Sequence, residues 1–187
     1  MKKAYLLLAD GTLFEGTAVG YEGQSIGEVV FNTGMAGYQE VLTDPSYAGQ
    51  AVVMTYPLIG NYGICYEDME SDRPWPDGYI VRELSRIPSN FRSEDTIQNF
   101  LEKYDIPGIS GVDTRALTKI LREKGTMNGM ITTNENYDLE EILPKLAAYE
   151  VGDVVSKVTC DEAYVLPGDS YKVALLDYGA KNNIARS

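Results

Sequence analysis

The first half of the chain alternates short apolar runs with clusters of glycine, proline, asparagine and aspartate, a pattern typical of β-strands joined by turns. Residues 3–8 and 12–19 flank Asp10-Gly11, a dipeptide that suits the positive φ angles of a tight turn. We therefore predict a β-hairpin there. Further strands are predicted from apolar and β-branched runs at 27–33, 51–56 and 77–84.

Helical periodicity begins after residue 92. Ser93 is followed by polar residues and then by apolar residues at helical spacing, which predicts a helix that Ser93 caps and Pro107 ends. A second helix is predicted from Asp113 to Gly125, because aspartate precedes it, basic residues occupy its last turn and glycine follows. We expect these helices to follow the β-rich part rather than alternate with it.

The pattern becomes weaker after a predicted short strand at 128–132. A helix is expected from Asp138, and Pro144 should interrupt it because proline lacks the backbone N–H. Residues 134–170 contain nine acidic and two basic residues and have poor periodicity. We interpret them as an acidic, partly helical connector.

The last residues have a different pattern. Residues 171–177 form a compact apolar run, and a glycine turn and an emerging helix follow, as at the start of a βαβ unit. A lone first strand of a parallel sheet cannot bury both faces, so we interpret this segment as the beginning of a truncated domain. The expected fold class is β-rich α/β, with segments at 1–133, 134–170 and 171–187.

Composition limits the possible chemistry. The chain has 187 residues and no histidine, which excludes a Ser-His-Asp triad, a Cys-His pair and a histidine-bearing zinc site within it. Sixteen basic and 28 acidic residues give a net charge of −12, which argues against nucleic-acid binding. The first apolar run is too short for a signal peptide or a membrane span, so we expect a cytoplasmic protein without membrane contact.

The nucleophile candidates are few. Cys65 and Cys160 cannot form a disulfide framework in a chain of this size, and no basic neighbour within two residues activates Cys65. We interpret both as small buried or incidental thiols and assign no catalytic or metal-binding residue. The cluster 60–63 lacks the lysine and spacing of a P-loop, so a turn between strands is expected.

Ser46 is the strongest candidate for a binding contact. It follows Thr43-Asp44-Pro45, a rigid turn that would hold its hydroxyl in a defined direction. Without a nearby base it cannot be an activated nucleophile, so a hydrogen bond is the most it can offer. On local grounds alone, an ordinary turn or helix-cap serine is the favoured interpretation.

Residues 27–47 form a long recognisable string, which ends in Asp44-Pro45-Ser46-Tyr47. This string resembles the amino-terminal domain of the small subunit of glutamine-dependent carbamoyl-phosphate synthase, and further segments resemble it in the same order. Residues 176–184 resemble the opening of that subunit's class I glutamine amidotransferase domain. The other matching segments are 55–63, 89–92, 113–118 and 121–131.

The resemblance implies a swivelling β/β/α-type domain followed by the first strand of the amidotransferase domain. In that family the small subunit hydrolyses L-glutamine and passes ammonia through a tunnel to a large subunit. The large subunit uses ATP and Mg²⁺ to make carbamoyl phosphate for arginine and pyrimidine synthesis. The amino-terminal domain docks onto that large subunit. Because ATP and Mg²⁺ are used by the large subunit, no cofactor is expected in this chain.

The resemblance also assigns residues. Ser46 matches the serine through which the family's amino-terminal domain contacts glutamine, whereas Cys65 and Cys160 match no catalytic motif. The family's catalytic cysteine, histidine and glutamate belong to a domain that these residues do not include. The alternative is a free-standing binding or scaffolding domain with the same fold and no glutaminase attached.

Overall fold

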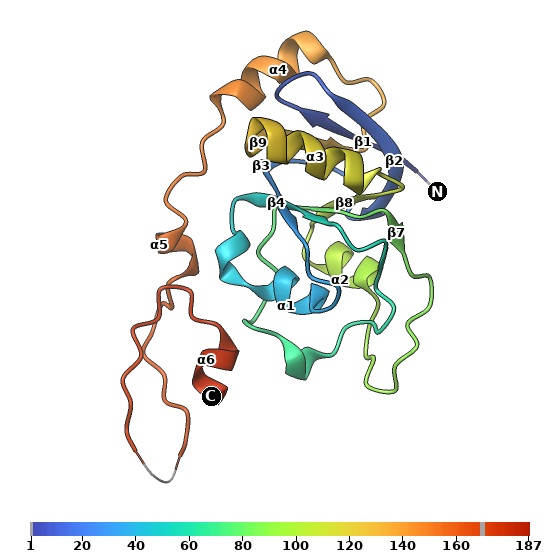
Figure 1. Cartoon of the computed structure of the whole chain (residues 1–187). Helices are drawn as coiled ribbons and strands as arrows, with labels where there is room; N and C mark the ends of the chain where they lie inside the picture. Colours follow the sequence, from blue (N-terminus) through green and yellow to red (C-terminus); the bar gives the residue numbers. More distant parts are fainter. Residues whose placement is uncertain (1, 169–170) are drawn as a thin grey trace.

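The computed structural model describes residues 2–168 and 171–187. Seven strands form a closed barrel in the order β1-β2-β8-β6-β4-β3-β9, and two short strands form a separate parallel pair, β5-β7 (Figure 1). The barrel strands are β1 (Lys3–Leu8), β2 (Leu13–Gly20), β3 (Gln24–Asn32), β4 (Gln50–Met54), β6 (Gly78–Ile80), β8 (Pro107–Ser110) and β9 (Met127–Thr132). The small pair is β5 (Leu58–Ile59) and β7 (Glu83–Leu84). The β-rich α/β class predicted from the sequence is confirmed.

Helices cover the barrel at several places. The α-helices are α1 (Tyr38–Thr43), α2 (Ile97–Lys103), α3 (Thr114–Lys124), α4 (Leu139–Ala148), α5 (Val155–Val158) and α6 (Asn182–Arg186). The two 3₁₀ helices are η1 (Pro45–Tyr47) and η2 (Tyr66–Asp68). In Figure 1, α3 and α4 lie on one side of the barrel and α1 and α2 on the other, while the C-terminal residues run down one flank.

Three apolar clusters hold these layers together. All seven barrel strands and α3 supply the interior cluster, in which Val53 and Leu117 are fully buried. A second cluster joins the outer face of the barrel to α1 and α2, and Val52 and Phe100 belong to it. A third joins β1 and β9 to α4. Because neighbouring residues of β4 enter different clusters, this strand is buried on both faces, which explains its continuous apolar run.

Several predicted elements are confirmed, among them the hairpin of β1 and β2, helix α3 with Asp113 as its N-cap, and α4 with Asp138 as its N-cap. The single strand predicted at 77–84 is wrong, since this stretch is divided between β6 in the barrel and β7 in the small pair. The predicted interruption at Pro144 is also wrong. Proline lies inside α4, where Ile142 and Leu146 of that helix pack onto the barrel.

The predicted N-cap at Ser93 is wrong, because Thr96 caps α2 by accepting a hydrogen bond from the N–H of Asn99 at 3.2 Å. Residues 94 and 95 are instead held extended. The N–H groups of Glu94 and Asp95 both donate to the carbonyl of Ile64, and the N–H of Ile64 donates to Asp95. A contact with a distant part of the chain therefore decides where the helix begins.

The strand predicted at 171–177 does not form, although all seven of these residues are described. Tyr171 and Val173 are 93% and 88% exposed, and no neighbouring strand pairs with the segment. A β-strand is stabilised by hydrogen bonds to a partner strand, so this segment forms no strand without one. The helix predicted after it is confirmed as α6.

Candidate functional site

Ser46 lies in a short turn between α1 and β4. Asp44 ends α1 in an extended conformation, as expected for a residue before proline, and Pro45 begins η1. The carboxylate of Asp44 accepts a hydrogen bond from the N–H of Ser46 at 2.9 Å. Two backbone bonds, from Tyr47 to Asp44 and from Ala48 to Pro45, close the turn. Ser46 itself is exposed on this turn.

A tyrosine pair fixes the start of α1. Tyr38 and Tyr62 stack with ring centroids 4.0 Å apart. The Tyr38 hydroxyl donates to the carbonyl of Gly63 at 2.8 Å and accepts from the N–H of Tyr62, while the Tyr62 hydroxyl accepts from the N–H groups of Gly37 and Tyr38. Burial is the main cause that raises the pKa of both phenols above the usual value. The pair joins the Ser46-bearing part of the chain to the 60–63 turn.

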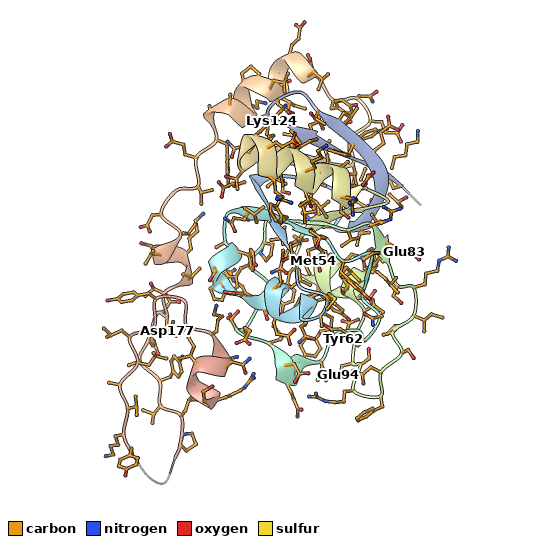
Figure 2. The ribbon with its side chains drawn as sticks, viewed as in Figure 1. Met54, Tyr62, Glu83, Glu94, Lys124 and Asp177 are labelled. Carbon is orange, nitrogen blue, oxygen red and sulfur yellow. The ribbon has the colours of Figure 1, made fainter. Side chains whose placement is uncertain are left out.

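The C-terminal segment lies against the Ser46 turn. The ammonium of Lys181 lies 3.1 Å from the second carboxylate oxygen of Asp44, the residue that holds Ser46. Asp177 stabilises the preceding turn by accepting hydrogen bonds from the N–H groups of Gly179 and Ala180 at 2.9 and 2.7 Å. The backbone bond from Ala180 is the largest influence on the carboxyl of Asp177, and its pKa is lowered. Figure 2 shows Asp177 within this flanking segment.

Glu70 connects the same segment to the body of the protein. Its side chain is buried, with the residue only 4% exposed, and it lies after η2. One carboxyl oxygen accepts from the N–H of Asn183 at 3.0 Å and the other accepts from the Asn183 side-chain amide. The carbonyl of Glu70 accepts from the N–H of Asn182, and Arg186 donates to the carbonyls of Glu67 and Met69. These bonds fix α6 against the segment around η2.

A cavity of about 560 Å³ lies between two parts of the chain. Residues within 157–164 and 177–182 line one side of it, and Pro45 and residues within 71–75 line the other. Pro45 lines it, whereas its neighbour Ser46 does not. The cavity therefore adjoins the Ser46 turn without including the serine hydroxyl. Its other lining residues include Arg73, Trp75, Cys160, Tyr164 and Asp177.

The remaining candidates from the sequence have structural roles. Cys65 is buried. The side-chain amide of Gln39 donates to the carbonyl of Cys65, and its oxygen accepts from the N–H of Cys65. Cys160 is exposed, so the burial expected for a small thiol holds for Cys65 alone. The cluster 60–63 is a turn closed by a bond from Gly63 to Gly60, as predicted. Within residues 2–168 and 171–187, no three His, Cys, Asp or Glu side chains gather as a metal site would require.

Sequence reasoning missed Glu70 and Lys181. Glu70 stands in an acidic stretch of the kind typical of a protein surface, and Lys181 follows a glycine turn. Their partners lie 113 and 137 residues away in the chain, and one sequence carries no signal of such pairings. Among the described helices, none is both long enough and apolar enough to cross a bilayer.

Comparison with known proteins identifies the family of this chain. The family described as carbamoyl-phosphate synthase small chain, CPSase domain, matches residues 6–131, which is most of the barrel with α1 to α3. The carbamoyl phosphate synthase small chain of Clostridium perfringens is 54% identical over 185 residues, covering 99% of this chain and 53% of the relative. That of Oceanobacillus iheyensis is 49% identical over 187 residues, covering 100% of this chain and 51% of the relative.

A third relative is the carbamoyl phosphate synthase pyrimidine-specific small chain of Halalkalibacterium halodurans, 49% identical over 183 residues. That alignment covers 97% of this chain and 50% of the relative. The chain therefore spans about half the length of the curated relatives it matches. With the family match over residues 6–131 and relatives aligned over 97–100% of these residues, the chain belongs to the carbamoyl-phosphate synthase small-chain family.

Proposed function

We propose that these residues are the amino-terminal part of a small subunit that hydrolyses L-glutamine and delivers ammonia to a large synthase subunit. The observation that carries the proposal is the 54% identity to a small chain over 99% of these residues. The barrel with its helices would be the swivelling β/β/α-type domain of this family. Residues 171–187 would begin the class I amidotransferase domain, whose missing strands would cover their exposed apolar side chains.

Within this function, the hydroxyl of Ser46 makes one hydrogen bond to the bound glutamine. Its exposed position on a rigid turn supports this role, as does the contact of Lys181 with Asp44, which brings the start of the second domain to the same turn. A fixed hydroxyl contributes to specificity because a ligand that cannot pair with it would leave a polar group unsatisfied. The chemical step itself would use groups of the second domain.

The proposed partner is the large subunit, in the cytoplasm, and ATP and Mg²⁺ act there rather than on these residues. The alternative is a free-standing binding domain without a glutaminase. Tyr171, Val173 and Leu176 argue against it, because an independent domain rarely exposes a continuous apolar run of this kind. The coding sequence beyond residue 187 separates the two: an open frame with a Gly-x-Cys-x-Gly-x-Gln elbow supports the subunit, and a stop codon excludes it.

Residues 1–187 alone are expected to release no ammonia from glutamine, because they contain no histidine and no activated cysteine. The measurement is ammonia production by the purified polypeptide compared with a buffer blank. A Cys65→Ala, Cys160→Ala double variant is the control for a stray thiol reaction. Turnover above the blank that persists in this variant would contradict the assignment of catalysis to a second domain.

In the natural chain that contains these residues, Ser46→Ala is expected to raise KM for glutamine roughly 3- to 10-fold with little change in kcat. A neutral hydrogen bond contributes about 0.5–1.5 kcal/mol, and a contact made equally in the ground and transition states affects KM alone. Steady-state glutaminase kinetics measure both constants. Ser89→Ala, an exposed serine on another loop, is the matched control. An unchanged KM for glutamine in Ser46→Ala would contradict this contact and would show that Ser46 is only a turn residue.

A further inference from the structure

The segment 82–92 has large apolar side chains that are exposed to solvent. It leaves the small β5-β7 pair and returns to α2 as a loop that projects from the lower edge of the body in Figure 1. Figure 2 labels Glu83 near its beginning and Glu94 just past its end. Within it, Phe91 is 98% exposed and Ile87 is 79% exposed. Large apolar side chains on a projecting loop are typical of a protein-binding surface.

The loop is held in one conformation by bonds to the body of the protein. The N–H of Ser85 donates to the carbonyl of Ile59 at 2.7 Å, and the N–H of Ser89 donates to the carbonyl of Asn61 at 2.8 Å. At the far end, Arg92 makes an ion pair with Asp68 at 2.9 Å. A loop fixed in this way loses little conformational entropy when it binds, so its exposed side chains are preorganised for a partner.

The charge of the loop is opposite to that of the whole chain. Residues 82–92 contain three arginines and one acid, Glu83, in a chain of net charge −12. Arg92 is paired with Glu67 and Asp68, so Arg82 and Arg86 are the arginines that can meet a partner. Arg82 and Arg86 are exposed. A basic patch of this kind attracts a surface that carries carboxylates, and the attraction would guide the apolar side chains into place.

We propose that Arg86, Ile87 and Phe91 form a docking site for a protein that offers an apolar pocket rimmed by carboxylates. The inference rests on the proposed function, in which that protein is the large synthase subunit. Two other occupants are disfavoured by charge. A symmetric dimer through this loop would bring Arg82 and Arg86 of one copy close to those of the other, and the −12 chain repels the phosphates of a nucleic acid.

The first test is binding of the large synthase subunit encoded in the same genome to the natural chain that contains these residues. Phe91→Ala is expected to weaken binding roughly 30-fold, the size of a hot-spot truncation at an interface centre. The dissociation constant is measured by calorimetry or by surface-immobilised kinetics. Because Phe91 is almost fully exposed, the variant should retain the thermal unfolding midpoint of the parent.

Arg86→Glu tests the electrostatic part of the site. It is expected to slow association with the large subunit roughly 10-fold at low salt and to reduce the dependence of the association rate on salt, as for a steering charge. Leu13→Ala, an exposed apolar truncation on the β1-β2 hairpin, is the matched control and should bind as the parent does.

The outcomes separate the two proposals. If the parent binds the large subunit and Phe91→Ala binds as tightly as Leu13→Ala, the docking site is wrong and the proposed function stands. If the parent does not bind at all, both are wrong. A parent chain that dimerises by itself, with Phe91→Ala restoring the monomer, would assign the loop to a second copy and overturn the inference.

Discussion

Gly63→Ala is expected to lower the free energy of unfolding by about 3 kcal/mol, from left-handed backbone strain together with steric overlap. Gly63 has φ of +72°, and a Cβ atom there would lie 2.0 Å from the hydroxyl of Ser93 and 2.8 Å from the carbonyl of Asp95. The second contact is with backbone that the bridge to Ile64 holds in place, so it cannot simply rotate away. The substitution would push the segment around Gly63 away from residues 93–95, and the 82–92 loop is attached to both.

The control for this prediction is Gly11→Ala in the β1-β2 turn. Gly11 has φ of +84° but no atom within 4 Å of its would-be Cβ, so only the backbone strain, about 1 kcal/mol, remains. Urea unfolding of both variants, with the slopes compared, gives the two free energies. If the two variants lost the same free energy of unfolding, the close approach of Ser93 and Asp95 to Gly63 would not contribute to the loss.

The sequence predicted correctly those elements whose ends are determined by turn or cap residues close to them in the chain. Asp10-Gly11 specifies the hairpin turn, and Asp113 with Gly125 specifies both ends of α3, because each acts on backbone within a few residues of itself. The continuous apolar run of β4 also predicted a strand from neighbouring residues alone. For these elements, composition and spacing were sufficient.

The errors arose where distant parts of the chain compete with local preference. Ser93 has the chemistry of an N-cap, but the bridge between Ile64 and Asp95 keeps the following residues extended, so Thr96 takes that role. Residues 171–177 have the composition of a strand but find no partner strand. The closure of the barrel by parallel pairs such as β3-β4 and β4-β6 likewise depends on contacts that no local window contains.

The candidate site shows the same division. The turn that presents Ser46 was predictable, because Asp44 and Pro45 act directly on the backbone beside it. The position of Lys181 on Asp44 and of Asn183 on Glu70 was not, since the partners are separated by 137 and 113 residues along the chain. The sequence therefore indicates the turn that exposes Ser46, and only the structure shows that Lys181 lies against this turn.

Glu70→Ala is expected to release α6 from the body of the protein. The substitution removes both acceptors of Asn183, and hydrogen bonds to a charged group contribute about 1.5–3 kcal/mol each. A loss of about 3 kcal/mol in the local opening free energy would raise amide exchange at residues 182–186 roughly 100-fold, with the barrel amides unchanged. Hydrogen exchange resolved by residue or by short peptide measures this difference.

Glu67→Ala is the matched control, because Glu67 lies three residues earlier, and its mostly exposed side chain forms only a surface ion pair with Arg92. Surface pairs contribute about 0–1 kcal/mol, and the carbonyl through which Glu67 holds Arg186 is kept in the variant. Glu70→Gln should fall between the two, since its amide oxygen still accepts one bond from Asn183. If Glu70→Ala and Glu67→Ala gave the same exchange at 182–186, the buried carboxyl would not be what fixes α6. The contact of Lys181 with Asp44 would then be the remaining candidate for that role, and Asp44→Asn would test it by the same exchange measurement.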